Sequence, residues 1–258
     1  MSLRRATVAA ALAVLAVYGG LLASLGWFLD RSALCATLTS TRMLFALRLS
    51  LLTALVAAAL AVAVGIPAAY ALSRFRFRGH QLVDMVLELP LVVSPAALGA
   101  MLLVFFANPF GAWIQVNVVR FVFGVAGVVL AQWVTVLGMT VRLLKTAFDE
   151  VPRELETVAR TLGATQSHAV WTVTLPLASR GIVAAFILAW AKALGEFGAT
   201  IMVAGTMAMR TETLPIAIYL RLSSADLPGT VALILMLVGI GLFALELTRR
   251  LLRATAHA

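Results

Sequence analysis

The sequence has very little charge. Only 12% of its 258 residues are Asp, Glu, Lys or Arg, about half of the share found in soluble globular domains. Hydrophobic residues make up 62% of the chain, and the mean hydropathy is +1.03. This composition excludes an ordinary soluble globular protein and indicates a chain that lies mainly in a membrane.

Cysteine and histidine are also scarce. The single cysteine, Cys35, excludes an internal disulfide, and His80, His168 and His257 do not have the spacing of zinc ligands. The sequence contains no Gly-x4-Gly-Lys-Ser/Thr phosphate loop and no Ser/His/Asp or His-Glu-x-x-His constellation. We therefore expect no metal, no cofactor and no catalytic residues in this chain.

Long apolar windows of the length that crosses a bilayer as a helix follow one another along the chain. They cover residues 7–29, 49–73, 89–107, 121–141, 181–205 and 227–245. Among them only 181–205 contains charges, at Lys192 and Glu196. The first window exceeds the core of a secretory signal, so we interpret it as a retained helix. The pattern predicts an all-α polytopic bundle of about six spans, with residues 1–258 forming one transmembrane domain.

The excess of cations also has a pattern. The chain has 20 Lys and Arg against 11 Asp and Glu. If successive spans cross the membrane in alternating directions, most of the cations lie on one side of the membrane. Short cytoplasmic loops are rich in Lys and Arg. The distribution predicts that both termini are cytoplasmic. It also explains the basicity by topology, so that no nucleic-acid partner is expected.

The segment 142–180 is too long for a simple connection between helices. Within it Leu155, Val158, Ala159 and Leu162 recur at helical steps. Pro152 suits a helix start and Gly163 a helix end, so the pattern predicts a short amphipathic helix from about 152 to 162. Such a helix lies on the membrane surface or serves as a docking surface for a cytoplasmic partner.

The spacing inside this segment supports the docking interpretation. The segment contains a pattern that resembles the cytoplasmic coupling motif of ABC-transporter permeases. The pattern is Thr157-Val158-Ala159, three residues, Gly163, nine residues, Val173, one residue and Leu175-Pro176. Thr157 replaces the Glu of that motif and Val158 its first Ala, while Glu156 comes one place early. The resemblance implies that 142–180 is a cytoplasmic coupling loop, with these residues at the ATPase: Glu156, Thr157, Val158, Ala159, Gly163, Ala164, Leu175 and Pro176.

Further segments extend the resemblance over about 44–248. Residues 47–55, 65–74 and 87–99 look like parts of the second and third permease helices, and residues 193–201 and 211–219 are similar to importers of tetrahedral oxyanions. The resemblance implies a type I ABC importer permease in the cell membrane, most similar to those for molybdate or tungstate. Sulfate, thiosulfate or another small solute is the alternative cargo.

The same resemblance implies the partners. They are a cytoplasmic ABC ATPase dimer that binds ATP and Mg, an extracytoplasmic oxyanion-binding protein and a second permease copy, with a homodimer as the default. A secondary transporter driven by an ion gradient is the alternative of a different class. It would have acidic residues at mid-membrane on several helices or inverted repeats, whereas only one window here contains charge.

Polar or helix-breaking residues inside the windows are candidates for the transport pathway. Lys192 and Glu196 are four residues apart, so they either pair on one helix face or leave Lys192 facing a passing anion. Gly residues permit close helix contact or a pivot, and prolines interrupt the backbone hydrogen bonds. The candidates are Pro90, Ser94, Pro95, Lys192, Gly195, Glu196, Gly198 and Thr200.

Overall fold

A computed structural model describes residues 3–253, which form helices and turns and contain no strand. His257 lies outside the described residues. The helices are α1 Leu3–Leu25, α2 Arg31–Thr39, α3 Thr41–Arg74, α4 His80–Val92, α5 Pro95–Ala107, α6 Pro109–Asn117, α7 Val125–Asp149, α8 Arg153–Thr161, α9 Gln166–Ala169, α10 Leu175–Leu194, α11 Gly198–Ala204, α12 Leu214–Ser223 and α13 Leu227–Arg253.

Five helical stretches within the described residues are long and apolar enough to cross a membrane. They are Thr7–Phe28, Thr41–Arg74, Val125–Asp149, Gln166–Leu194 and Leu227–Leu251. The pair α4 and α5 makes a sixth if it is counted as one broken span. The prediction of a polytopic helical bundle with about six spans is confirmed.

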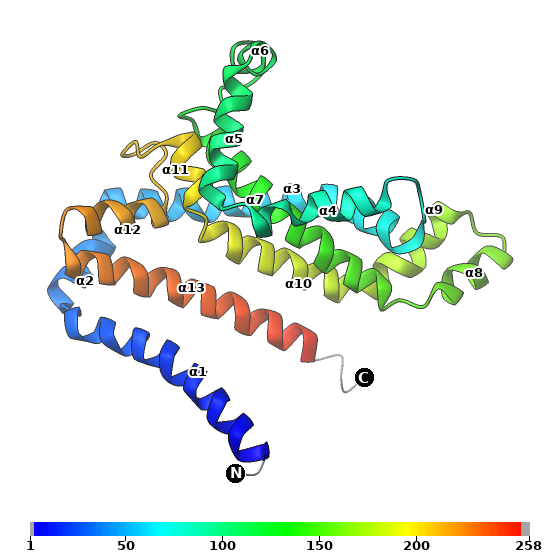
Figure 1. Ribbon diagram of the computed structural model, residues 1–258, viewed down its shortest axis with the longest axis horizontal. Helices are drawn as coiled ribbons and strands as arrows, with labels where there is room; N and C mark the ends of the chain where they lie inside the picture. Colours follow the sequence, from blue (N-terminus) through cyan, green and yellow to red (C-terminus); the bar gives the residue numbers. More distant parts are fainter. Residues whose placement is uncertain (1–2, 254–258) are drawn as a thin grey trace.

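The helices α3, α7, α10 and α13 run along the long axis of the molecule and form its bundle (Figure 1). The core between α3, α7 and α10 consists mainly of small side chains, with Ala54, Ala57 and Ala61 packed against Val136 and Ala193. Small residues let helix backbones approach closely, which is the main source of packing energy where lipid replaces water.

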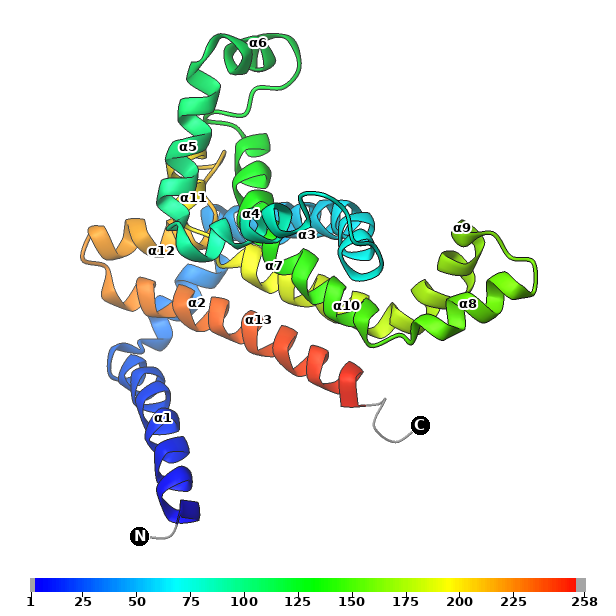
Figure 2. The same ribbon diagram turned by 45° about the vertical axis from the view of Figure 1, so that its right-hand side comes forward.

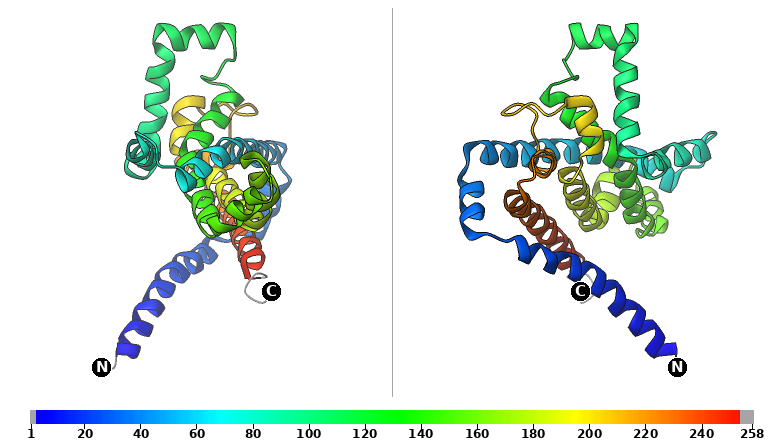
Figure 3. Two further views of the ribbon diagram at one scale, coloured as in Figure 1. Left: turned by 90° about the vertical axis from the view of Figure 1, so that its right-hand side faces the viewer. Right: turned by 60° about the vertical axis from the view of Figure 1, so that its left-hand side comes forward.

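The two ends of the bundle differ. The short helices α8 and α9 lie at one end, and α2 and α12 lie at the other (Figures 1 and 2). Between them α5 rises across the bundle and places α6 at its tip, while α1 diverges from the other helices (Figure 3). None of the apolar window of α1 is buried within the chain.

The third window does not form one straight helix over 89–107, so that boundary was wrong. The helix begins at His80, ends at Val92 and continues as α5 after a bend of 113°. Ser94 caps α5 by accepting a hydrogen bond from the Ala97 N–H, and Pro95 occupies its first turn. A proline lacks the N–H that a continuing helix would need, so the chain turns at this point.

The fifth window also differs from the prediction. The helix that enters this window begins before residue 181, because a π turn at Val170–Thr174 leads directly into α10 at Leu175. Pro176 is the second residue of α10 and follows directly after the π turn. The helix ends at Leu194, and residues 198–204 form the separate helix α11.

Candidate functional site

The helix α8 begins and ends close to where the sequence predicted. Pro152 precedes it, Glu154 and Glu156 lie in its first turn, and it ends at Thr161. Gly163 follows with φ of +97°, a left-handed conformation that glycine adopts without steric cost. The predicted amphipathic helix at 152–162 is thereby confirmed.

The inner side of α8 is fixed to the bundle through Glu156. Arg74 Nε at the end of α3 lies 2.9 Å from Glu156 Oε1. The Tyr70 hydroxyl donates to Oε2 at 2.9 Å, and the Thr174 hydroxyl donates to Oε1 at 2.6 Å. One carboxylate therefore joins α8 to α3 and to the π turn before α10. We call these four residues the Glu156 brace.

The Glu156 brace keeps its carboxylate ionised. Burial by itself raises the pKa of Glu156, but the hydrogen bonds donated by Thr174, Tyr70 and Arg74 outweigh it, so that the pKa lies below its ordinary value of 4.5. Arg74 also donates to the Val151 carbonyl at 2.8 Å. The end of α3 thus holds both α8 and the segment that leads into it.

Sequence reasoning placed Glu156 among the residues at the ATPase surface but did not predict that its carboxylate faces its own bundle. It also missed Tyr70, Arg74 and Thr174 as partners. Arg74 was considered as one of the cations that set the topology and as part of the permease-like segment 65–74, but not as a partner of Glu156. Its position 82 residues before Glu156 gave no signal, because contacts between distant segments depend on how the helices pack.

The outer side of α8 is apolar. Leu155, Val158 and Leu162 are 42%, 54% and 84% exposed, and Thr157 between them is exposed. Leu155 also lines a cavity with Ala147 of α7 and Leu177 of α10, and Ala159 is half-buried, so only part of the apolar pattern that predicted the helix faces outward. Exposed apolar patches of this kind mark contact surfaces. We call Leu155, Val158 and Leu162 the α8 outer face.

The other residues of the coupling motif surround this helix. Ala159 and Ala164 are half-buried beside Gly163, Leu175 is half-buried at the start of α10, and Pro176 is exposed. The structure thus gathers the motif at the α8 end of the bundle (Figure 2).

Several pathway candidates meet where two broken helices cross. A Cβ atom added to Gly198 would lie 2.9 Å from the backbone N of Ala96 and 3.1 Å from Pro95 Cβ. A Cβ added to Gly99 would lie 2.8 Å from the Cα of Ala199. The break before α5, with Ser94 and Pro95, therefore packs against the start of α11 at backbone contact distance. Pro90 lies apart from this crossing, inside α4.

Of the two alternatives left open for Lys192 and Glu196, the ion pair on one helix face does not form. Glu196 is 2% exposed and lies beyond the end of α10, where its Oε1 accepts a hydrogen bond from the Ala199 N–H at 3.0 Å. Lys192 is exposed in the last turn of α10 and makes no ion pair within residues 3–253. The helix α10 ends at Leu194 with Gly195 as its C-cap, so the two side chains do not share one helix face.

Two buried polar side chains near this region have unused hydrogen-bonding groups. Thr200 on α11 is fully buried and its hydroxyl has no partner within residues 3–253. Gln132 on α7 is also fully buried, and neither of its amide atoms has a partner there. Sequence reasoning included Thr200 and missed Gln132, although an uncharged amide in an apolar window was the available signal.

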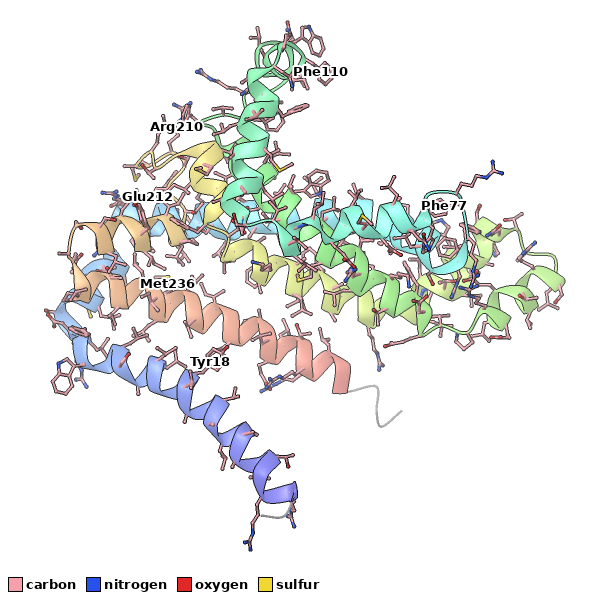
Figure 4. The ribbon with its side chains drawn as sticks, viewed as in Figure 1. Tyr18, Phe77, Phe110, Arg210, Glu212 and Met236 are labelled. Atoms are coloured by element: carbon pink, nitrogen blue, oxygen red, sulfur yellow. The ribbon has the colours of Figure 1, made fainter. Side chains whose placement is uncertain are left out.

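The opposite end of the bundle has its own polar contacts. Arg42 Nε lies 2.8 Å from Glu212 Oε2, which joins the start of α3 to the loop before α12. The Ser50 hydroxyl accepts a hydrogen bond from the Leu214 N–H at 2.7 Å. Figure 4 shows Glu212 at this end, with Phe110 at the tip of the α5–α6 arm. The loop between α11 and α12 is thereby anchored to α3.

No group of three or more His, Cys, Asp or Glu side chains that could hold a metal ion occurs within residues 3–253.

Comparisons with known proteins match most of the chain. The family model described as "Binding-protein-dependent transport system inner membrane component" matches residues 61–257. A probable molybdenum ABC transporter permease protein of Haloferax volcanii is 40% identical over 220 residues, which cover 85% of this chain and 80% of the relative. The molybdenum transport system permease protein ModB of Mycobacterium tuberculosis is 38% identical over 79% of this chain and 77% of its own.

A sulfate permease is also similar. The sulfate transport system permease protein CysT of Escherichia coli is 33% identical over 76% of this chain and 72% of its own. Among solved structures, a bacterial ABC transporter that imports the polysaccharide alginate has a chain with a TM-score of 0.74, 16% identity and coverage of 96% and 95%. This likeness shows the fold. The chain is a multi-pass membrane protein that belongs to the inner-membrane permease components of binding-protein-dependent ABC transporters.

Proposed function

We propose that the chain is the permease of an ATP-driven importer of molybdate, with α8 as the helix that receives motion from the ATPase. The α8 outer face supports the coupling role, since three apolar side chains at the tip of the molecule remain exposed while the Glu156 brace fixes the other side of the same helix. A force applied to the outer face would pass through Glu156 to α3 and to α10. The bundle can then switch between two arrangements as the ATPase binds and releases ATP and Mg²⁺.

The cargo is inferred from the relatives. The permeases that are 38–40% identical are named for molybdenum. The similar sulfate permease makes sulfate the alternative cargo. Molybdate and sulfate are both tetrahedral dianions, so the same pathway chemistry suits them. We infer that Lys192, a cation in a span that makes no ion pair within residues 3–253, faces the pathway and attracts the dianion. Tungstate is a further member of this chemical class.

The partners follow from the same proposal. A cytoplasmic ABC ATPase dimer contacts α8, and an extracytoplasmic binding protein delivers the oxyanion at the α12 end. A second copy of the chain supplies the other half of the pathway, because Lys192 lies on the surface of a single chain. Both termini are then cytoplasmic.

The test combines co-purification with uptake. The tagged chain is expressed with the ATPase and binding protein of its own host in cells that lack molybdate and sulfate uptake. A Val158→Asp variant should reach the membrane but lose the ATPase and at least nine-tenths of the molybdate uptake, because a charge on the α8 outer face would be buried in the contact. Ser167→Asp on α9, exposed but outside that face, should behave like the wild type.

Two results would contradict the proposal. Normal ATPase recovery and uptake by the Val158→Asp variant would exclude α8 as the coupling surface. Uptake of sulfate that exceeds uptake of molybdate at equal concentrations would replace the proposed cargo with the alternative.

A further inference from the structure

A cavity of about 800 Å³ opens at the α8 end of the bundle. Its walls come from the end of α3, the turn at 75–79, the start of α4, the end of α7 and the residue that begins α8. Figure 4 shows Phe77 at this end of the molecule. The cavity does not belong to the coupling surface or to the crossing of α5 and α11.

The cavity is cationic. Its lining includes Arg74, Arg76, Lys145 and Arg153 but only one acidic residue, Asp149. Arg74 is paired with Glu156, and Lys145 Nζ lies 2.9 Å from Asp149 Oδ2. Arg76 and Arg153 make no ion pair within residues 3–253. Two guanidinium charges thus remain without an acidic partner in one cavity.

The rim of the cavity is apolar on one side. Phe75 and Phe77 are 45% and 42% exposed, and Leu82 at the start of α4 is 62% exposed. The exposed apolar surface continues along α4 through Met85 and Val86, which are 66% and 51% exposed. Aromatic side chains beside cations are typical of the level at which lipid headgroups lie.

We propose that this cavity binds the phosphate of an anionic phospholipid, with the acyl chains of the lipid lying along α4. A guanidinium group matches phosphate oxygens with paired N–H donors, and basic pockets between transmembrane helices on the cytoplasmic side bind anionic headgroups. The apolar path along α4 favours a lipid over a free oxyanion, which would need no such surface. The inference rests on the cytoplasmic placement of α8 proposed above.

The position of the cavity links the lipid to coupling. Arg153 is the first residue of α8, and it donates a hydrogen bond to the Ser73 carbonyl of α3. Arg74, on the same wall, belongs to the Glu156 brace. A phosphate bound between these side chains holds the start of α8 against α3. Anionic lipid should therefore strengthen the attachment of α8 to the bundle.

Arg76 and Arg78 form a matched pair for the experiment. They lie two residues apart in one exposed turn, and only Arg76 lines the cavity. The purified full chain, with the partners that co-purify, is placed in phosphatidylcholine vesicles with 0–30 mol% phosphatidylglycerol. Lipid retained after extraction is counted by native mass spectrometry. The wild type should retain phosphatidylglycerol at one site per chain. Arg76→Gln should retain it about five-fold more weakly, and Arg78→Gln should retain it as the wild type does.

Each of the following outcomes would overturn the proposal. Equal losses in the two variants would indicate a diffuse attraction to the membrane surface. Displacement of the lipid by millimolar inorganic phosphate or molybdate would indicate a site for a free oxyanion. Equal retention by Arg76→Gln and the wild type, with Arg76→Gln eluting as a folded chain, would exclude the cavity. Because this measurement needs no uptake and no ATPase, its failure is distinguishable from failure of the proposed transport function.

Discussion

Arg74 at the end of α3 lies 2.9 Å from Glu156 in α8, although 82 positions separate them in the sequence. Their side chains are only 5% and 12% exposed, so the pair is shielded from water. A shielded pair loses more when one partner is removed than an exposed pair does. The attachment of the coupling helix to the bundle therefore depends strongly on this contact.

Glu156→Gln should loosen α8. The substitution leaves the guanidinium of Arg74 without its counter-ion, at a cost of about 3 kcal/mol. Amide hydrogen exchange in α8 should become about a hundred-fold faster, and uptake should fall at least ten-fold. Glu154→Gln, in the same turn but exposed, should leave both unchanged. Equal effects of the two substitutions would contradict the brace.

The attachment of α8 to the bundle through Glu156 should be insensitive to pH in the physiological range. The pKa of Glu156 is lowered below 4.5 in the folded chain, so its stabilising effect is present above the unfolded pKa and is lost as the pH falls through the folded pKa. Hydrogen exchange in α8, corrected for the intrinsic rate, should be constant from pH 8 to about 5.5 and should rise only below about 4.5. A rise centred near pH 6.5 would show that another group controls the contact.

Substitutions of Gly163 should act through the backbone conformation that they disfavour rather than through the size of the new side chain. Its φ is +97°, and an added Cβ would meet nothing within 4 Å. Gly163→Ala should therefore destabilise the end of α8 by about 1 kcal/mol and lower uptake several-fold, while Gly163→Asn should retain more activity because Asn tolerates positive φ. Uptake that falls equally for both variants would indicate a steric role instead.

The crossing of α5 and α11 should not tolerate an added methyl group. Gly99→Ala would place a Cβ 2.8 Å from the Cα of Ala199, and overpacking of this kind costs about 1–3 kcal/mol. The melting temperature in detergent should fall by about 5 °C. Gly239→Ala on α13, where nothing lies within 4 Å, serves as the control and should be neutral. An unchanged melting temperature for Gly99→Ala would contradict the close packing.

Lys192 should act through its charge. Lys192→Met should reduce molybdate uptake at least ten-fold without lowering the melting temperature, because the lysine has no ion pair to lose within the described residues. Lys192→Arg should keep a substantial part of the uptake, since it preserves the positive charge. A fall in stability without a specific loss of uptake would assign Lys192 a structural role.

Much of the architecture was predictable from composition and periodicity. Long uncharged windows predict membrane spans because a charge in hydrocarbon is costly, and this rule needs no knowledge of neighbouring helices. The helix α8 was also predictable without knowledge of neighbouring helices. Its signals are Pro152, the apolar repeat and Gly163, and all of them act within a few residues of each other. The orientation of the termini and the cargo pathway remain predictions.

Other features depend on how distant segments pack. The sequence alone determined that Pro90 and Pro95 interrupt the backbone hydrogen bonding of the third window and that α8 has an apolar side, because both effects arise from local backbone and side-chain chemistry. Only the tertiary structure decided that Glu156 faces Arg74, that Glu196 accepts a hydrogen bond from the Ala199 N–H instead of pairing with Lys192, and that Arg76 and Arg153 share one cavity. Such contacts depend on where each helix ends and how it is rotated in the bundle, and the packing of the whole chain sets both.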